Sequence, residues 1–238
     1  MMRIGSDKWK RLIQDGSEEF DISLEPGQID LFVVHAVELV KWNRKINLTA
    51  IADPLEIAVK HFLDSIAPAG LIPPDGTMLD VGSGGGFPGI PLKILFPSLT
   101  VTLIDASRKK TNFLKHLIRT LKLKGIQALH VRAADLADVN SKISFGQDSG
   151  FEKEFDVVIC RALTSLDGFA LMAFPLLNRG GFIIALKGKV TEAEMESVRL
   201  LSEKAPGVTG IGDRQFSAIV KKYTLPYLGS ERSIVIIK

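Results

Sequence analysis

Residues 78–89 of the chain read Met-Leu-Asp-Val-Gly-Ser-Gly-Gly-Gly-Phe-Pro-Gly. The apolar run ends at Val81, three spaced glycines follow, and Pro88 suits the start of a helix. Gly82, Gly84 and Gly86 let the backbone turn tightly and approach a ligand without a Cβ clash. The pattern predicts a strand, a glycine-rich turn and a helix whose first N–H groups suit an anionic group. Such turns serve NAD, flavin and methyl-donor sites alike, and a purely structural turn is the alternative.

Two aspartates discriminate among these ligands. Asp80 precedes Gly82 by two residues, where a carboxylate repels a pyrophosphate but attracts the ammonium and sulfonium of S-adenosylmethionine. Asp105 ends the next predicted strand at a spacing that suits hydrogen bonds from ribose hydroxyls. Asp80 therefore favours a methyl donor, although it could instead cap a helix or a turn. Asp105 fits the adenosine of either kind of cofactor, or the N-cap of the helix that follows it.

Short apolar stretches alternate with helical ones beyond this motif. We expect strands at 77–81, 100–105, 127–131, 155–160 and 181–186, and helices at about 89–96, 108–123 and 167–177. This alternation is typical of a parallel sheet with helices on both faces. The polar segment 140–154 predicts a surface loop. A helix near 192–202 and extended stretches at 214–225 and 233–237 predict a hairpin-like closure on the sheet edge.

The beginning of the chain has a helical pattern instead. Apolar residues recur at helical spacing between Pro26 and Ile46, and a shorter helix is expected at 54–63. The sequence Pro-Pro-Asp-Gly at 73–76 then breaks the pattern. We therefore predict a helical N-terminal region, 1–72, and a methyltransferase domain, 73–238.

Composition limits the class of protein. The chain has 238 residues, 46% of them hydrophobic, which is enough for a substantial core. It has one cysteine, no apolar run long enough to span a bilayer and no secretory signal, so we expect a cytoplasmic protein without a cysteine-based metal site. The net charge is only +3, but basic residues cluster at 41–45 and 108–124. These clusters are either solvated helix faces or part of a nucleic-acid surface.

The ends of the third and fourth strands supply further candidates. Ala133 and Ala134 are small enough to let an adenine ring approach the backbone, and Asp135 could reach its amine or cap a turn. Arg161 should lie near the transferred methyl group, because the carboxyl ends of parallel strands line the ligand crevice. The sequence lacks the Pro-Pro-aromatic and Pro-Cys runs used to methylate amines and pyrimidine rings. Cys160 is better explained as buried packing than as a nucleophile.

Several segments together resemble the RsmG (GidB) family of bacterial 16S rRNA guanine-N7 methyltransferases. They are KWNRKINLT at 41–49, KHFLDS at 60–65, residues 79–91, IDASRKK at 104–110, RA at 161–162, ALKG at 185–188 and ER at 231–232. The resemblance implies a Rossmann-like class I methyltransferase, with a mostly parallel seven-stranded sheet, an antiparallel edge strand and a helical N-terminal extension. It also implies S-adenosylmethionine as cofactor and 16S rRNA, or a small-subunit particle, as the partner of a monomeric enzyme.

The resemblance also assigns residues to the cofactor site. Its cofactor-contacting positions, together with the turn residues above, are Asp80, Gly82, Gly84, Gly86, Phe87, Asp105, Ala133, Ala134 and Arg161. The family often has Glu where this chain has Ala134. Backbone contacts at 133–134 survive that change, but a side-chain contact to the adenine is in doubt.

Guanine N7, the target atom that the resemblance implies, agrees with the lack of the Pro-Pro-aromatic and Pro-Cys runs. Guanine N7 has an in-plane lone pair and no proton to lose, so neither a general base nor a covalent nucleophile is needed, and we assign no catalytic residue. Candidates for holding the base or a phosphate are His61, Arg161, Lys187 and Arg232, each of which could instead be an ordinary ion-paired residue. Asn47 is a further candidate for contact with the substrate. The alternatives are a small-molecule methyltransferase on the same fold, an NAD-dependent oxidoreductase, and a non-catalytic RNA-binding protein that retains the pocket.

Overall fold

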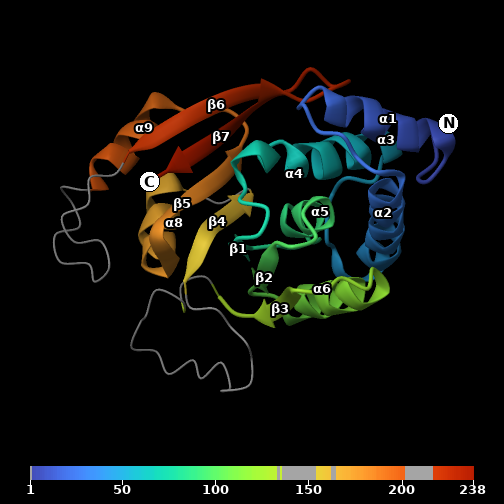
Figure 1. Cartoon of the computed structure of the whole chain (residues 1–238), viewed down its shortest axis with the longest axis horizontal. Helices are drawn as coiled ribbons and strands as arrows, with labels where there is room; N and C mark the ends of the chain where they lie inside the picture. Colours follow the sequence, from blue (N-terminus) through green and yellow to red (C-terminus); the bar gives the residue numbers. More distant parts are fainter. Residues whose placement is uncertain (1, 133–134, 136–153, 162–164, 202–216) are drawn as a thin grey trace.

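The computed structural model describes residues 2–132, 135, 154–161, 165–201 and 217–238. Ala133, Ala134 and most of the expected loop at 140–154 lie outside these described residues. In the described part of the chain, strands form one sheet of seven in the order β3-β2-β1-β4-β5-β7-β6 (Figure 1). The strands are β1 (Thr77–Val81), β2 (Thr100–Asp105), β3 (Ile126–His130), β4 (Phe155–Arg161), β5 (Leu177–Lys187), β6 (Ala218–Thr224) and β7 (Glu231–Ile237).

The sheet confirms the predicted fold class. Strands β1 to β5 pair in parallel, and β7 pairs antiparallel with both β5 and β6. The antiparallel strand therefore lies one place in from the edge, because the last two strands form a hairpin whose first member, β6, is outermost. The registers pair Val81 with Ile104 and with Cys160, and Arg161 with Leu186, so the carboxyl ends of these strands lie level along one side of the sheet.

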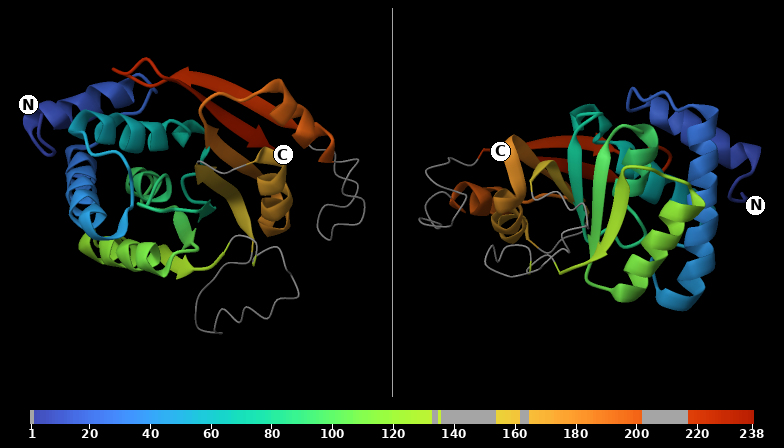
Figure 2. Two further views of the ribbon diagram at one scale, coloured as in Figure 1. Left: turned by 180° about the vertical axis from the view of Figure 1, so that it is seen from behind. Right: turned by 60° about the horizontal axis from the view of Figure 1, so that its bottom comes forward.

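Alternating side chains of the strands supply two separate apolar layers, as expected for the period of two in a strand. On one face Leu79, Val158 and Ile183 pack with α8 (Leu166–Ala173), η3 (Phe174–Leu176) and α9 (Glu192–Arg199). On the other face Met78, Val157 and Ile184 join the core formed with α5 (Gly89–Leu95) and α6 (Arg108–Thr120). Figure 2 shows these two groups of helices on opposite sides of the sheet.

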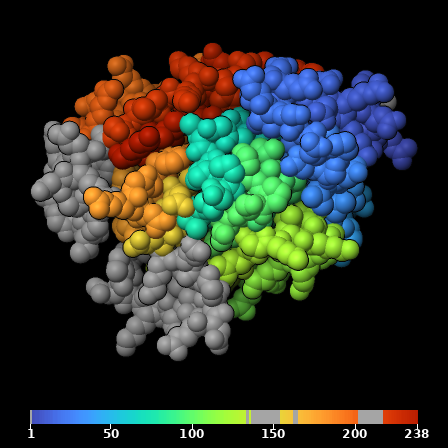
Figure 3. All heavy atoms as spheres, in the orientation of Figure 1, coloured from blue at the N-terminus to red at the C-terminus, as the bar shows by residue number. Residues whose placement is uncertain are grey.

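The N-terminal helices pack on the second of these layers. They are α1 (Asp7–Glu18), α2 (Pro26–Ile46), and a continuous run of α3 (Pro54–Glu56), π-helical η1 (Ile57–Leu63) and α4 (Asp64–Ile66), followed by η2 (Ala69–Leu71). Residues 1–72 and 73–238 thus share one apolar core, which contains Trp9, Phe32 and Phe62 together with strand residues. In Figure 3 the blue N-terminal helices form a continuous surface with α6 and the β6–β7 hairpin.

Most predicted elements are confirmed, and the differences have local causes. Helix α8 gives way to the 3-10 turn η3 because Pro175 has no N–H to continue the ladder. Strand β5 begins at Leu177, four residues before the predicted start, across a bulge opposite Phe155 and Val157. Helix α1, capped by Ser6, was not predicted as a separate element. In the described chain, no helix has the length and apolar character needed to span a bilayer.

Candidate functional site

The glycine turn is open in its first half and packed in its second. Gly82, Gly84 and Gly86 all have positive φ, at 74°, 55° and 90°. A Cβ added at Gly82 would meet nothing within 4 Å, and one at Gly84 would meet only a carbonyl oxygen at 3.7 Å. A Cβ at Gly86 would lie 2.8 Å from Ile90 Cδ1 and one at Gly85 2.9 Å from Leu39 Cδ1. The backbone at 82–84 therefore faces space that a ligand could fill.

Asp105 ties this turn to the next strand. Its Oδ2 accepts a hydrogen bond from Gly84 N (3.0 Å) and its Oδ1 accepts one from Ser107 N (2.7 Å). The N-cap of α6 is Ser107, whose Oγ accepts from Lys110 N, so Asp105 does not fill the alternative capping role. Each carboxylate oxygen has a second lone pair, and the side chain is in position to accept from a hydroxyl beside Gly84.

Asp80 has the structural role that the sequence left as its alternative. The side chain is fully buried, and its Oδ2 accepts from Gly89 N at the start of α5 (2.9 Å). Its Oδ1 has no partner among the described residues. Burial raises the pKa of this carboxyl to about 7. Asp80 thus supports the turn from beneath and has no surface exposed for a direct contact.

Phe87 lies in a stack of three rings beneath the site. Its ring is stacked on His35 at 4.5 Å and on His61 at 4.6 Å between centroids. Burial lowers the pKa of His35 to about 4 and that of His61 to about 3, so both rings are neutral near pH 7. The guanidinium carbon of Arg161 lies 5.2 Å from the Phe87 centroid. With only 3% of its surface exposed, Phe87 shapes the wall of the site.

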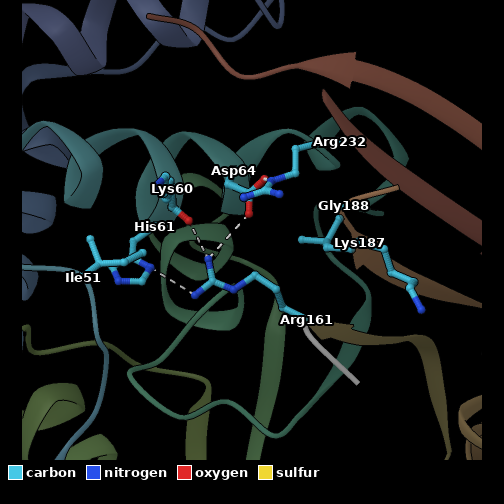
Figure 4. A pocket seen from close by; sticks show the side chains of 9 residues that line it. Ile51, Lys60, His61, Asp64, Arg161, Lys187, Gly188 and Arg232 are labelled. Atoms are coloured by element: carbon cyan, nitrogen blue, oxygen red, sulfur yellow. Dashed lines mark hydrogen bonds and ion pairs between the residues drawn. The ribbon is translucent and has the colours of Figure 1, made fainter. Parts of the chain in front are cut away.

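A cleft of about 340 Å³ opens beside the carboxyl ends of β4 and β5 (Figure 4). Arg161, at the end of β4, reaches across it to the π-helical stretch η1. Its Nη1 donates to Lys60 O (2.8 Å) and its Nη2 donates to His61 Nδ1 (3.2 Å). An arginine only donates, so His61 Nδ1 accepts and its Nε2 carries the proton toward Thr49 Oγ1 (3.0 Å). The cleft is lined by Ile51, Lys60, His61, Asp64, Arg161, Leu186, Lys187, Gly188 and Arg232.

The charges of the cleft do not cancel. Lys60 is paired with Glu56, and Lys187 with Glu194. Asp64, the one carboxylate among the lining residues, lies between Arg161 and Arg232 in Figure 4. Two guanidinium groups facing one carboxylate leave an excess positive charge, which suits an electron-rich base or a phosphate.

The predicted residues fall into distinct groups. His61, Arg161, Lys187 and Arg232 line one cleft, although they come from four separate elements; Gly82, Gly84 and Asp105 form the open turn. Asn47 is exposed, has left-handed backbone angles at the end of α2, and does not line the cleft. Ala133 and Ala134 are outside the described residues. Cys160 is buried and burial raises its pKa well above the ordinary range, which fits a packing role.

Two charged residues of the cleft, Lys60 and Asp64, were not among the predicted site residues, although both lie in the resembling segment 60–65. The signal that could have found Asp64 is a carboxylate in an otherwise apolar helical stretch, between Leu63 and Ile66, where burial without a partner is costly. The π-helical geometry of η1, often found at functional sites, has no comparable signal in the sequence.

Comparisons with known proteins identify the family of the chain. A model of the GidB family, described as rRNA small subunit methyltransferase G, matches residues 28–207. Ribosomal RNA small subunit methyltransferase G of Geobacter sulfurreducens is 39% identical over 225 residues, covering 94% of this chain and 95% of that protein. The protein of the same name from Syntrophus aciditrophicus is 40% identical over 233 residues, covering 97% and 90%.

Solved structures share the fold at low sequence identity. TYW2 of M. jannaschii in complex with AdoMet aligns with a TM-score of 0.50 at 16% identity, covering 73% of this chain and 72% of that chain. TYW2 of P. horikoshii in complex with MeSAdo also has a TM-score of 0.50, at 14% identity, covering 73% and 60%. These two likenesses concern the architecture alone.

Proposed function

Because this chain belongs to the rRNA small subunit methyltransferase G family, we propose that it transfers a methyl group from S-adenosylmethionine to N7 of a guanine in bacterial 16S rRNA. The chain is therefore a methyltransferase on a Rossmann-like fold. The RNA, the base and the atom are the proposed part, and the proposal implies action in the cytoplasm, where ribosomal subunits are assembled.

The glycine turn fits S-adenosylmethionine. Open space at Gly82 and Gly84 leaves room for the ligand against the backbone, and Asp105 is in position to accept from the ribose hydroxyls. When bound, the cofactor supplies a methyl group on a positively charged sulfur. We assign Asp80, Gly86 and Phe87 to the support of this pocket rather than to direct contact, because all three are packed against other residues.

The observation that carries the proposal is that neither titratable group at the centre of the cleft is available as a general base. His61 already accepts from Arg161 and directs its proton to Thr49, and its pKa is lowered to about 3 by burial. Asp64 faces two guanidinium groups and accepts from Tyr223 OH. A target that must lose a proton would need such a base, whereas N7 of guanine needs only to be held in line with the methyl group.

Arg232 offers the donors for recognising the base. In the described part of the chain the contact of Arg232 with Asp64 is through Nε, and no hydrogen bond is made by its Nη1 or Nη2, whereas each Nη of Arg161 already uses one of its two N–H groups. Guanine has an acceptor, O6, next to N7 on the same edge, and an adenine has a donor amine in its place. An arginine that donates to O6 leaves the N7 lone pair free and rejects adenine.

The test is methyl transfer with labelled S-adenosylmethionine to 30S subunits and to protein-free 16S rRNA, followed by mapping of the modified nucleotide. We expect one guanine modified at N7. Arg232→Gln should lower kcat/KM by about 10-fold or more, as expected for the loss of a charged contact to a base, without changing cofactor affinity. Arg199→Gln, which alters an exposed arginine of α9, is the matched control and should behave as wild type. Cofactor binding without transfer to either RNA would contradict the proposal and favour a small-molecule substrate or a non-catalytic role.

A further inference from the structure

Asp64 is a buried carboxylate at which four distant elements meet. It begins α4, immediately after the π-helical stretch, and is 4% exposed. Its Oδ1 accepts from Tyr223 OH of β6 at 2.7 Å and lies 3.4 Å from Arg232 Nε of β7. Its Oδ2 lies 3.7 Å from Arg161 Nη1 of β4. The helix, the end of β4 and the C-terminal hairpin are therefore connected through one side chain.

The negative charge of Asp64 allows Arg161 and Arg232 to lie close together in the cleft. Like charges repel, and each guanidinium is largely shielded from water, with side-chain exposures of 21% for Arg161 and 27% for Arg232. Burial lowers the pKa of Arg161, and the nearby Asp64 charge opposes that effect. Without the carboxylate, the two groups would move apart or recruit another anion.

The contact with Asp64 also leaves the Nη groups of Arg232 free to donate to a ligand. Asp64 faces Nε of Arg232, on the stem side of the guanidinium, so the two Nη groups remain available in the cleft. The hydroxyl group of Tyr223 donates a hydrogen bond that holds the Asp64 carboxylate in place. The Tyr223 ring packs edge-on against Phe20, with 5.8 Å between the ring centroids. The orientation of Arg232 is therefore set by the Asp64 carboxylate, which Tyr223 in turn holds in place.

We propose that Asp64 is a positioning residue, oriented by Tyr223, that holds Arg161 and Arg232 in the arrangement that presents guanine N7 to the methyl donor. This inference rests on the proposed function. A base held by O6 can still rotate about that contact, and only a fixed guanidinium keeps N7 in line for transfer. Asp64 thus governs the rate of transfer more than the affinity for RNA.

The test compares Asp64→Asn and Tyr223→Phe with the wild type. An asparagine keeps the size and can still accept from Tyr223, but it removes the charge between the arginines. With saturating cofactor we expect kcat for rRNA methylation to fall by about 10- to 100-fold in Asp64→Asn, as for a reacting group displaced by about 1 Å, and less in Tyr223→Phe. The KM for RNA should change by less than about threefold, because the cleft keeps both arginines. Asp30→Asn, which removes an exposed partner of Lys10, should match the wild type.

Two measurements separate positioning from a merely structural role. S-adenosylmethionine affinity by calorimetry should stay within about twofold of the wild type in both variants, since the hydrogen bond and the ion pairs of Asp64 go to Tyr223, Arg161 and Arg232 and none reaches the glycine turn. In an Arg232→Gln background, Asp64→Asn should cause a smaller loss of kcat than it does in the wild type, because the part of its effect that acts through Arg232 is already lost. An unchanged kcat in Asp64→Asn, full additivity with Arg232→Gln, or a parallel loss of cofactor affinity would overturn the inference. A wild-type protein that methylates no rRNA would instead overturn the proposed function.

Discussion

Gly84→Ala should abolish most cofactor binding while leaving the fold intact. Gly84 has φ of +55°, and the added Cβ would project into open space with its nearest neighbour at 3.7 Å. Left-handed backbone angles cost a non-glycine residue about 1–2 kcal/mol, which corresponds to a fall in Tm of about 2–8 °C for a chain of this size. The methyl group occupies the space assigned to the ligand, so the Kd for S-adenosylmethionine should rise by at least about 10-fold, measured by isothermal titration calorimetry.

A second glycine supplies the control for backbone strain. Gly229, in the turn between β6 and β7, has φ of +62° and no atom within 4 Å of an added Cβ. Gly229→Ala should therefore show a similar fall in Tm and unchanged cofactor affinity. If Gly84→Ala binds S-adenosylmethionine as tightly as Gly229→Ala does, the pocket does not lie against the glycine turn and the reasoning is refuted.

Three further predictions follow from the charges of the molecule. Asp105→Ala should weaken cofactor binding by about 1–3 kcal/mol in calorimetry, because the ribose loses a charged acceptor; unchanged affinity would remove Asp105 from the site. Below pH 6.5 the unfolded chain gains protons on His35 and His61 that the native state does not bind, while Asp80, with its raised pKa, gains one in the native state below about pH 7. The free energy of unfolding should therefore be about 1–2 kcal/mol lower at pH 5 than at pH 7. This loss should more than double in Asp80→Asn, because the opposing proton uptake by Asp80 in the native state is removed. Urea titrations that show a higher free energy of unfolding at pH 5 would contradict these pKa shifts. For RNA binding, the variant Lys41/Arg44/Lys45→Ala removes exposed basic residues at the end of α2. The slope of log affinity against log salt should become shallower by about 0.7–0.9 for each phosphate contact that is lost. An identical slope would mean that these side chains are only solvated.

Local sequence was enough to determine the strand–turn–helix unit and the order of elements. The bounds of β1 and β2 agree with the predicted ones because each is a short apolar run between Gly, Pro or Asp residues, and these signals act over a few residues. The positive φ angles at Gly82, Gly84 and Gly86 follow from the same local chemistry. The identity of the RNA and of the target atom came from family resemblance, since no spacing or composition specifies them.

Only the tertiary structure decided how the site is assembled. The Asp80 carboxylate, predicted to face a ligand, is buried at the start of α5, because its strand packs directly beneath that helix. Asp64, Arg161, Tyr223 and Arg232 meet because the order of the strands places the last hairpin beside β5, next to the end of β4. Contacts between residues so far apart in the chain depend on sheet order and on the packing of helices across it, and no local pattern encodes either. The sequence therefore determined which groups the protein has for its chemistry, and the packing of the sheet determined which of them stand together.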